Sequence, residues 1–203
     1  MTARVALALC FSAGAVARAD VPAHTPRTGE GTIAILGGLR YVPQASTLGF
    51  TDRKLFPGGV AGQFGYQYDD AISVAIDISY LADRYDFADF SRLHVGTTDV
   101  SFLLMWTPRP WGRLAPYLGG GAAYSFSSFL TTGQPVAIHE GSTQGAVLAG
   151  GLRLALWGGF GLQLEDRFVF AQADSTTHGS LDVGGNLLSL GLWVAMDADE
   201  SHH

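Results

Sequence analysis

The sequence holds a candidate pair for nucleophilic catalysis, His178 and Ser180, in a polar segment just ahead of the last apolar run. A histidine close to a serine can act as the general base that takes the hydroxyl proton and turns the oxygen into a nucleophile. A third polar group must orient the imidazole, and Asn186 and Asp182 are the nearest candidates. Because histidine and serine are common in polar loops, this pair supports an esterase only as an alternative function.

A second set of reactive residues is ionisable and falls in segments of alternating polarity, on the face that carries small or polar side chains. Its members are Arg40, Asp77, Asp99, Arg153, Glu165 and Arg167. We expect all of them to face the interior of the fold, where removing one partner of a buried pair costs about 3–5 kcal/mol. The charges therefore predict a salt-bridge network that fills the interior. The alternative is a gated polar path in which they select small solutes.

The elements that must position these residues are β-strands. Residues 71–82, AISVAIDISYLA, alternate apolar side chains with small or polar ones, which is the period of a strand with two unlike faces. Segments of this kind, each long enough for a tilted membrane strand, are predicted at 31–42, 58–68, 71–82, 97–107, 115–126, 143–156, 160–170 and 186–196. Their second faces are rich in Gly, Ala, Ser and Gln, which suit a crowded lumen better than a solvated surface. The apolar faces are therefore expected to meet lipid.

The connections between these segments alternate in length. Short turns are expected at 69–70, 108–114 and 157–159, and long loops at 43–57, 83–96, 127–142 and 171–185. Short turns at one end and long loops at the other are the layout of an outer-membrane barrel. Asp166 departs from the pattern, because it shares the apolar face of its segment. A bulge near Glu165-Asp166 is one way to turn it inward, and the sequence leaves open whether the strand has one.

Aromatic residues gather near the predicted strand ends, where an amphipathic ring suits the membrane interface. The predicted girdle residues are Tyr41, Tyr68, Tyr80, Trp106, Tyr117, Tyr124, Trp157 and Phe168. The alternative explanation is the ordinary preference of aromatic residues for strands.

Composition limits the class of protein. The 203 residues carry a net charge of −6, with a single lysine, Lys54, and four glutamates. Such a chain is a poor partner for nucleic acid and lacks the charged surface of a soluble exported protein. No cluster has metal-ligand spacing, since His139-Glu140 has no second ligand nearby, so we expect neither a metal nor a cofactor.

The first nineteen residues have the layout of an export signal, with Arg4, an apolar stretch at 5–16 and an A-x-A cleavage site at 17–19. Cleavage there would remove the only cysteine, Cys10, so disulfides are not expected. The expected organisation is a signal peptide at 1–19, a periplasmic lead-in at 20–30, an all-β barrel at 31–196 and a polar tail at 197–203.

Two stretches resemble the small outer-membrane β-barrel superfamily that includes the OmpA transmembrane domain and OmpW-like proteins. They are APYLGGGAAYSF (Ala115–Phe126) and LDVGGNLLSLGLWVAM (Leu181–Met196). The resemblance implies an eight-stranded antiparallel transmembrane β-barrel with a structural or minor small-solute permeability role and no catalysis. Such proteins usually end on an aromatic residue, whereas this chain ends in DADESHH (197–203).

The expected partners are outer-membrane lipid, lipopolysaccharide and the barrel-insertion machinery, and we expect a monomer. The stretch with His178 and Ser180 also resembles the lipid A 3-O-deacylases, which are eight-stranded barrels, although Leu181 stands where that family has asparagine. A lipid A-modifying esterase is thus the first alternative. The second is a soluble periplasmic lipocalin-like binder, which would need the apolar rows to face inward.

Overall fold

The computed structural model describes residues 23–41, 52–53, 58–86, 92–132, 138–175, 179–182 and 184–196. The expected signal peptide, the expected tail at 197–203 and parts of the expected long loops lie outside these residues. The described part of the chain contains no helix with the length and hydropathy of a membrane span.

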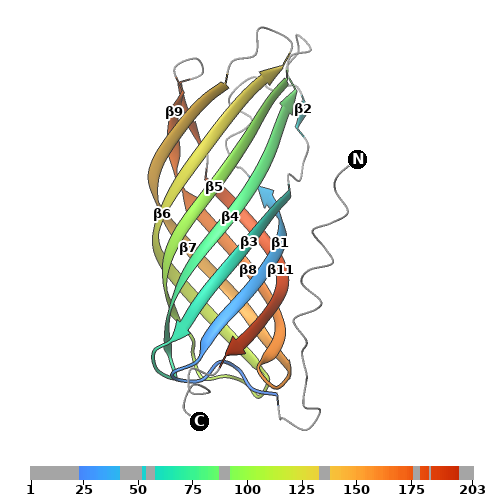
Figure 1. Ribbon diagram of the computed structural model, residues 1–203, viewed down its shortest axis with the longest axis vertical. Helices are drawn as coiled ribbons and strands as arrows, with labels where there is room; N and C mark the ends of the chain where they lie inside the picture. The colour runs from blue at the N-terminus through green and yellow to red at the C-terminus, as the bar shows by residue number, and fades with distance from the viewer. Residues whose placement is uncertain are drawn as a thin grey trace, which may run out of the picture.

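The fold is a closed antiparallel β-barrel, as predicted (Figure 1). Within the described residues its eight strands are β1 (Gly31–Tyr41), β3 (Gly58–Gln67), β4 (Ile72–Asp86), β5 (Arg92–Trp106), β6 (Leu114–Thr132), β7 (Ile138–Trp157), β8 (Phe160–Phe170) and β11 (Gly185–Met196). Each strand pairs with the next of this set, and β11 pairs with β1 to close the sheet. Short strands β2 (Asp52–Arg53), β9 (Gln172–Ser175) and β10 (Gly179–Asp182) lie in the connections.

The apolar rows lie on the outside of the barrel. On β4 the side chains of Ile72, Ile76 and Ile78 are exposed, whereas Ser73 and Asp77 between them are buried. The same alternation holds on β5 and β11, as the sequence period requires. This orientation is the reverse of what a lipocalin-like binder needs, and it is the orientation of strands that face lipid.

Four strands are longer than predicted. The strands β4, β5, β6 and β7 continue into the expected loops 83–96 and 127–142, where Tyr85 pairs with Leu93 and Phe129 pairs with His139. Sequence periodicity marks a strand only where its two faces differ. Beyond the apolar band the described outward-facing residues Ala82, Gly96 and Ser128 are small, so the pattern fades while the backbone hydrogen bonds continue.

The lead-in before β1 lies across the end of the barrel that carries the short turns (Figure 1). The backbone N–H of His24 donates to the carbonyl of Gly158 at 3.0 Å, and Gly29 N–H donates to the carbonyl of Gln67 at 2.8 Å. The imidazole Nε2 of His24 lies 3.3 Å from a carboxylate oxygen of Glu30. These bonds tie residues 24–30 to two different turns and so cover this mouth of the barrel.

Closure between β1 and β11 depends on a close approach at Gly191. A side chain added there would overlap the backbone oxygen of Ile35 on β1, whereas one added at Gly37 on the same seam would meet open space. We predict that Gly191→Val abolishes the heat-dependent shift in gel mobility that a closed membrane barrel displays, because the last strand can no longer pair.

The matched control is Gly37→Val, which places the same side chain on the outer face of the seam and should keep the shift. An unchanged shift in the Gly191→Val protein would show that the seam adjusts and that this glycine is not needed for closure.

Candidate functional site

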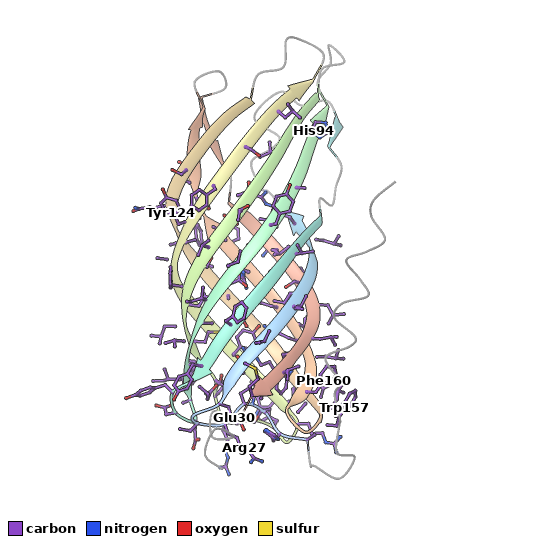
Figure 2. All side chains as sticks on the ribbon, in the orientation of Figure 1. Arg27, Glu30, His94, Tyr124, Trp157 and Phe160 are labelled. Atoms are coloured by element: carbon purple, nitrogen blue, oxygen red, sulfur yellow. The ribbon has the colours of Figure 1, made fainter. Side chains whose placement is uncertain are left out.

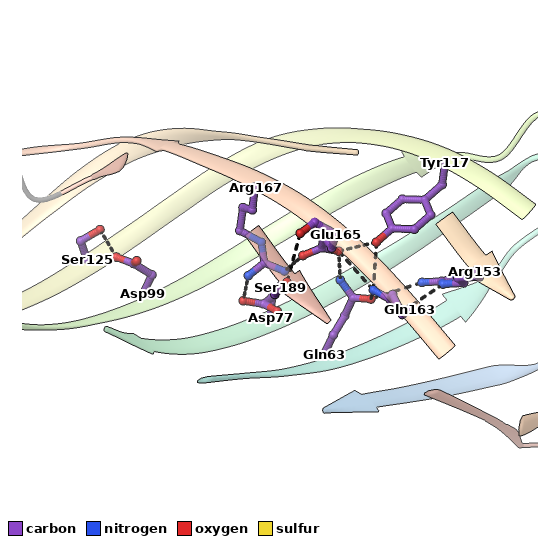
Figure 3. A network of polar contacts seen from close by, with 10 residues as sticks. All are labelled: Gln63, Asp77, Asp99, Tyr117, Ser125, Arg153, Gln163, Glu165, Arg167 and Ser189. Carbon is purple, nitrogen blue, oxygen red and sulfur yellow. Dashed lines mark hydrogen bonds and ion pairs between the residues drawn. The ribbon is translucent and has the colours of Figure 1, made fainter. Parts of the chain in front are cut away.

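A polar network crosses the lumen, and Arg167 on β8 lies at its centre (Figure 3). Its guanidinium forms ion pairs with Asp77 on β4 and with Glu165 on its own strand. All three side chains are buried. Because the arginine lies between two acids, it offsets the repulsion between carboxylates that a narrow lumen brings together.

Glu165 joins the charged part of the network to its neutral part. Its Oε2 atom accepts hydrogen bonds from the Tyr117 hydroxyl at 2.7 Å, from Gln163 Nε2 at 3.2 Å and from Gln63 Nε2 at 3.3 Å. Its backbone oxygen accepts a bond from Ser189 Oγ at 3.2 Å. One buried acid is therefore linked to strands on several sides of the barrel.

Arg153 on β7 extends the network toward the turn end of the lumen. Its Nε donates to Gln163 Oε1 at 3.1 Å, and its Nη2 donates to Gln63 Oε1 at 3.2 Å. The guanidinium carbon lies 5.0 Å from the centre of the Tyr117 ring, within the range of a cation–π contact. The arginine is thus held by amides and an aromatic face rather than by a direct ion pair among the described contacts.

The structure buries all of the ionisable residues that the sequence places in the lumen, which are Arg40, Asp77, Asp99, Arg153, Glu165 and Arg167. Ion pairs join Asp77, Glu165 and Arg167. Asp99 accepts a hydrogen bond from Ser125 Oγ at 2.5 Å, and Arg40 donates to the backbone carbonyl of Gly184. Both contacts lie apart from the Arg167 centre, nearer the long-loop end of the barrel.

The neutral members of the network were not predicted. The alternation of β3 indicates that Gln63 faces inward, yet nothing in one sequence indicates that its amide bridges Arg153, Gln163 and Glu165. An inward-facing glutamine on a strand of small residues is the one available signal, since a large amide in a narrow lumen must find partners.

Tyr117 corrects the predicted girdle. Its side chain is 2% exposed and lies in the lumen, where the hydroxyl donates to Glu165. Successive residues of β6 face opposite sides of the sheet. Leu118 is exposed on the outer wall, so its neighbour Tyr117 faces the lumen. A position near a strand end is therefore not enough to place an aromatic ring at the membrane interface.

The other girdle positions described by the structure lie on the outer wall. Tyr68, Tyr80, Trp106, Tyr124 and Trp157 are exposed, and Phe168 is partly exposed. Trp157 stacks on Phe160 at a centroid distance of 4.6 Å beside the last short turn (Figure 2). The side chain of Tyr41 lies outside the described residues.

Asp166 stays on the outer wall, and no bulge near Glu165-Asp166 turns it inward. The register around Asp166 is regular, and the irregularity between β7 and β8 lies at Ala155/Trp157 instead. The Asp166 carboxylate accepts a hydrogen bond from the Asn186 side-chain amide at 2.6 Å. The neighbouring strand thus supplies a polar partner for this outward-facing acid, and no inward rotation is needed.

The described residues offer little support for the esterase alternative. His178 and the side chain of Ser180 lie outside the described residues, although the backbone of Ser180 belongs to β10. The Asn186 amide, a candidate to orient the imidazole, donates to Asp166. Among the described residues, no three His, Cys, Asp or Glu side chains gather as a metal site requires.

No family model matches the chain, and no curated protein matches it in sequence. Solved structures do match it. Neisserial surface protein A superposes with a TM-score of 0.61 at 13% identity, covering 82% of this chain and 97% of that chain. This chain has the fold of the small eight-stranded outer-membrane β-barrels.

Two further structures agree with this assignment. The outer membrane protein OprG from Pseudomonas aeruginosa matches with a TM-score of 0.61 at 12% identity, covering 86% of this chain and 99% of that chain. AlkL matches with a TM-score of 0.54 at 16% identity, covering 88% of this chain and 95% of that chain. At these identities the likeness concerns the fold alone.

We predict that Arg167→Met lowers the free energy of unfolding by about 3–5 kcal/mol, because it leaves Asp77 and Glu165 buried without their countercharge. Urea titration of the protein folded in lipid vesicles measures the change. The matched control is Arg109→Met, at an exposed arginine in the turn between β5 and β6, which should change stability little.

A third variant separates charge from packing. Combining Arg167→Gln with Asp77→Asn and Glu165→Gln removes the charges together, and it should be less destabilised than Arg167→Met alone. An Arg167→Met protein as stable as the wild type would contradict a structural role for these ion pairs.

Proposed function

We propose that this protein resides in the outer membrane and has a structural role there, with a lumen closed to all but minor passage of small solutes and with no catalysis. The observation that supports this proposal is the network around Arg167 and Glu165. Its side chains come from β3, β4, β6, β7 and β8 and bond to one another across the lumen (Figure 3). A solute would have to break several of these bonds to pass.

The network around Arg167 and Glu165 acts as a plug of the lumen, and its geometry explains why this plug resists opening. The buried ion pairs and amides lie where water is scarce, so an unpaired group would cost more than it does at the surface. Eight strands also leave room in the lumen for little beyond side chains. The lead-in at residues 24–30 adds a second layer at the turn end. The lumen is therefore closed by two independent features, the network around Arg167 and the lead-in at the turn end.

The long-loop end of the lumen has different walls. Inward-facing residues there include the hydroxyl-bearing Thr97, Ser125 and Ser127 beside the charged Arg40 and Asp99. This half of the lumen suits water better than a large ligand. It is closed at its lower end by the network around Arg167. The arrangement supports a passive barrel more than a transporter.

Conductance across a planar bilayer tests the proposal. The wild-type protein should give no steady channel, whereas a variant with Gln63→Ala, Tyr117→Ala and Gln163→Ala should open measurable channels. The change removes the neutral part of the plug and leaves the balance of charges in the lumen intact. A steady channel in the wild type would overturn the closed-lumen proposal.

The matched control carries the same replacements at exposed positions of the outer wall, namely Tyr66→Ala, Gln144→Ala and Gln172→Ala. It should behave as the wild type does. Channels in the control would show that loss of stability, rather than loss of the plug, opens the barrel.

A further inference from the structure

The outer wall has several hollows, and one of them lies where β4 to β7 leave the apolar band. The hollow has a volume of about 440 Å³, and its lining includes Tyr80, Gly96, Thr98, Phe126, Ser128 and Ser142. It is open to the surroundings of the barrel and separate from the lumen network.

Strand register explains why these residues meet. Tyr80 pairs with Thr98, Thr98 with Phe126, and Phe126 with Ser142, so one row of neighbours crosses four strands. In the next row Gly96 pairs with Ser128 and has no side chain to fill the space. A Cβ at Gly96 would lie 3.0 Å from Ser128 Oγ and 3.3 Å from the Tyr80 hydroxyl. The hollow, which we call the groove, therefore exists because residue 96 is glycine.

The chemistry of the groove is mixed. The rings of Tyr80 and Phe126 are about half exposed and form apolar walls, and Phe126 packs edge-on against Tyr124 at a centroid distance of 4.8 Å. Hydroxyls lie between the rings, and the Tyr124 hydroxyl donates to Ser142 Oγ at 3.0 Å. Aromatic faces beside hydroxyl groups suit a sugar ring, whose C–H face packs on the aromatic ring while its own hydroxyls exchange hydrogen bonds.

The height of the groove on the wall restricts its ligand. Tyr80 is eight residues beyond Ile72 on β4, which is about 26 Å along the strand and about 20 Å in height at a usual tilt. Directly below it lie the exposed Ile78 and its pairing partner Val100, which is partly exposed. Above it lies His94, partly exposed near the long-loop end (Figure 2). The groove thus lies at the boundary between the apolar band and the polar rim.

We propose that this groove binds the sugar headgroup of an outer-leaflet glycolipid, with the acyl chains lying against Ile78 and Val100. The proposal rests on the outer-membrane location proposed above. A sugar linked to acyl chains matches the order of surfaces along the wall, with the apolar row below and the aromatic and hydroxyl groups above it. A phospholipid would match the lower surface but would leave these hydroxyls without sugar partners.

The test uses purified lipopolysaccharide, consisting of lipid A and core sugars, as the probe. Binding to the folded protein in detergent is measured by calorimetry for the wild type, for Gly96→Val and for Gly62→Val. Valine at position 96 fills the groove, whereas Gly62 on the outer wall of β3 has no atom near its Cβ position. The wild type and Gly62→Val should bind alike, and Gly96→Val should bind about tenfold more weakly.

A second variant guards against a folding defect in Gly96→Val. Thr98→Val keeps the side-chain volume and removes a hydroxyl of the groove, so it should weaken binding severalfold while the heat-dependent gel shift remains. Equal binding by all four proteins, or no binding by any, would overturn the proposal. Equal binding of phosphatidylethanolamine would also overturn it, because acyl chains alone would then suffice. The variants Gly96→Val, Gly62→Val and Thr98→Val should all have the bilayer conductance of the wild type. The binding measurement therefore tests the groove independently of the closed-lumen proposal.

Discussion

The rest of this structure depends on one constraint, which is that a backbone in lipid must satisfy its own hydrogen bonds. No water is available to the N–H and C=O groups of an open sheet edge, so the first and last strands must pair. The pairing of β1 with β11 meets this requirement, and it brings the backbones so close that Gly191 has no room for a side chain. Closure with eight strands then sets a narrow lumen, and the alternation of side chains assigns every second residue to it.

The narrow lumen determines what its charges can do. Glu165 and Arg167 are neighbours on the inner face of β8, and closure brings Asp77 of the distant strand β4 to the same arginine. The space that remains is taken by amides and by Tyr117, which bond to the acid and to Arg153. Since these polar groups bond mainly to one another, the lumen network is better suited to holding the barrel closed than to binding a ligand.

The sequence indicates the faces of the strands more reliably than their contacts. A period of two shows that Asp77 and Asp99 face inward while the isoleucines of β4 face outward, because a strand has no other way to arrange them. The pairing of Arg167 with Asp77 depends on the stagger of distant strands, which a single sequence does not contain. The period of its strand already places Asp166 outward, but its partner Asn186 could not be predicted, since it lies on another strand. Tyr117 is different, because the alternation of its strand already indicates that the side chain faces the lumen. The girdle prediction was wrong because it used only the position of Tyr117 near a strand end.

The outer wall carries chemistry that the lumen does not offer. In the lumen, carboxylates, guanidinium groups and amides meet one another at hydrogen-bond distance. On the wall near the polar rim, the hydroxyls of Thr98 and Ser128 and the ring of Tyr80 border a hollow that no side chain fills. A barrel too narrow to hold a ligand inside can still recognise one outside, because the membrane presents each part of a lipid at a fixed height on its wall. The strands that run past the apolar band supply the polar half of such a surface, and this gives their extra length a physical reason.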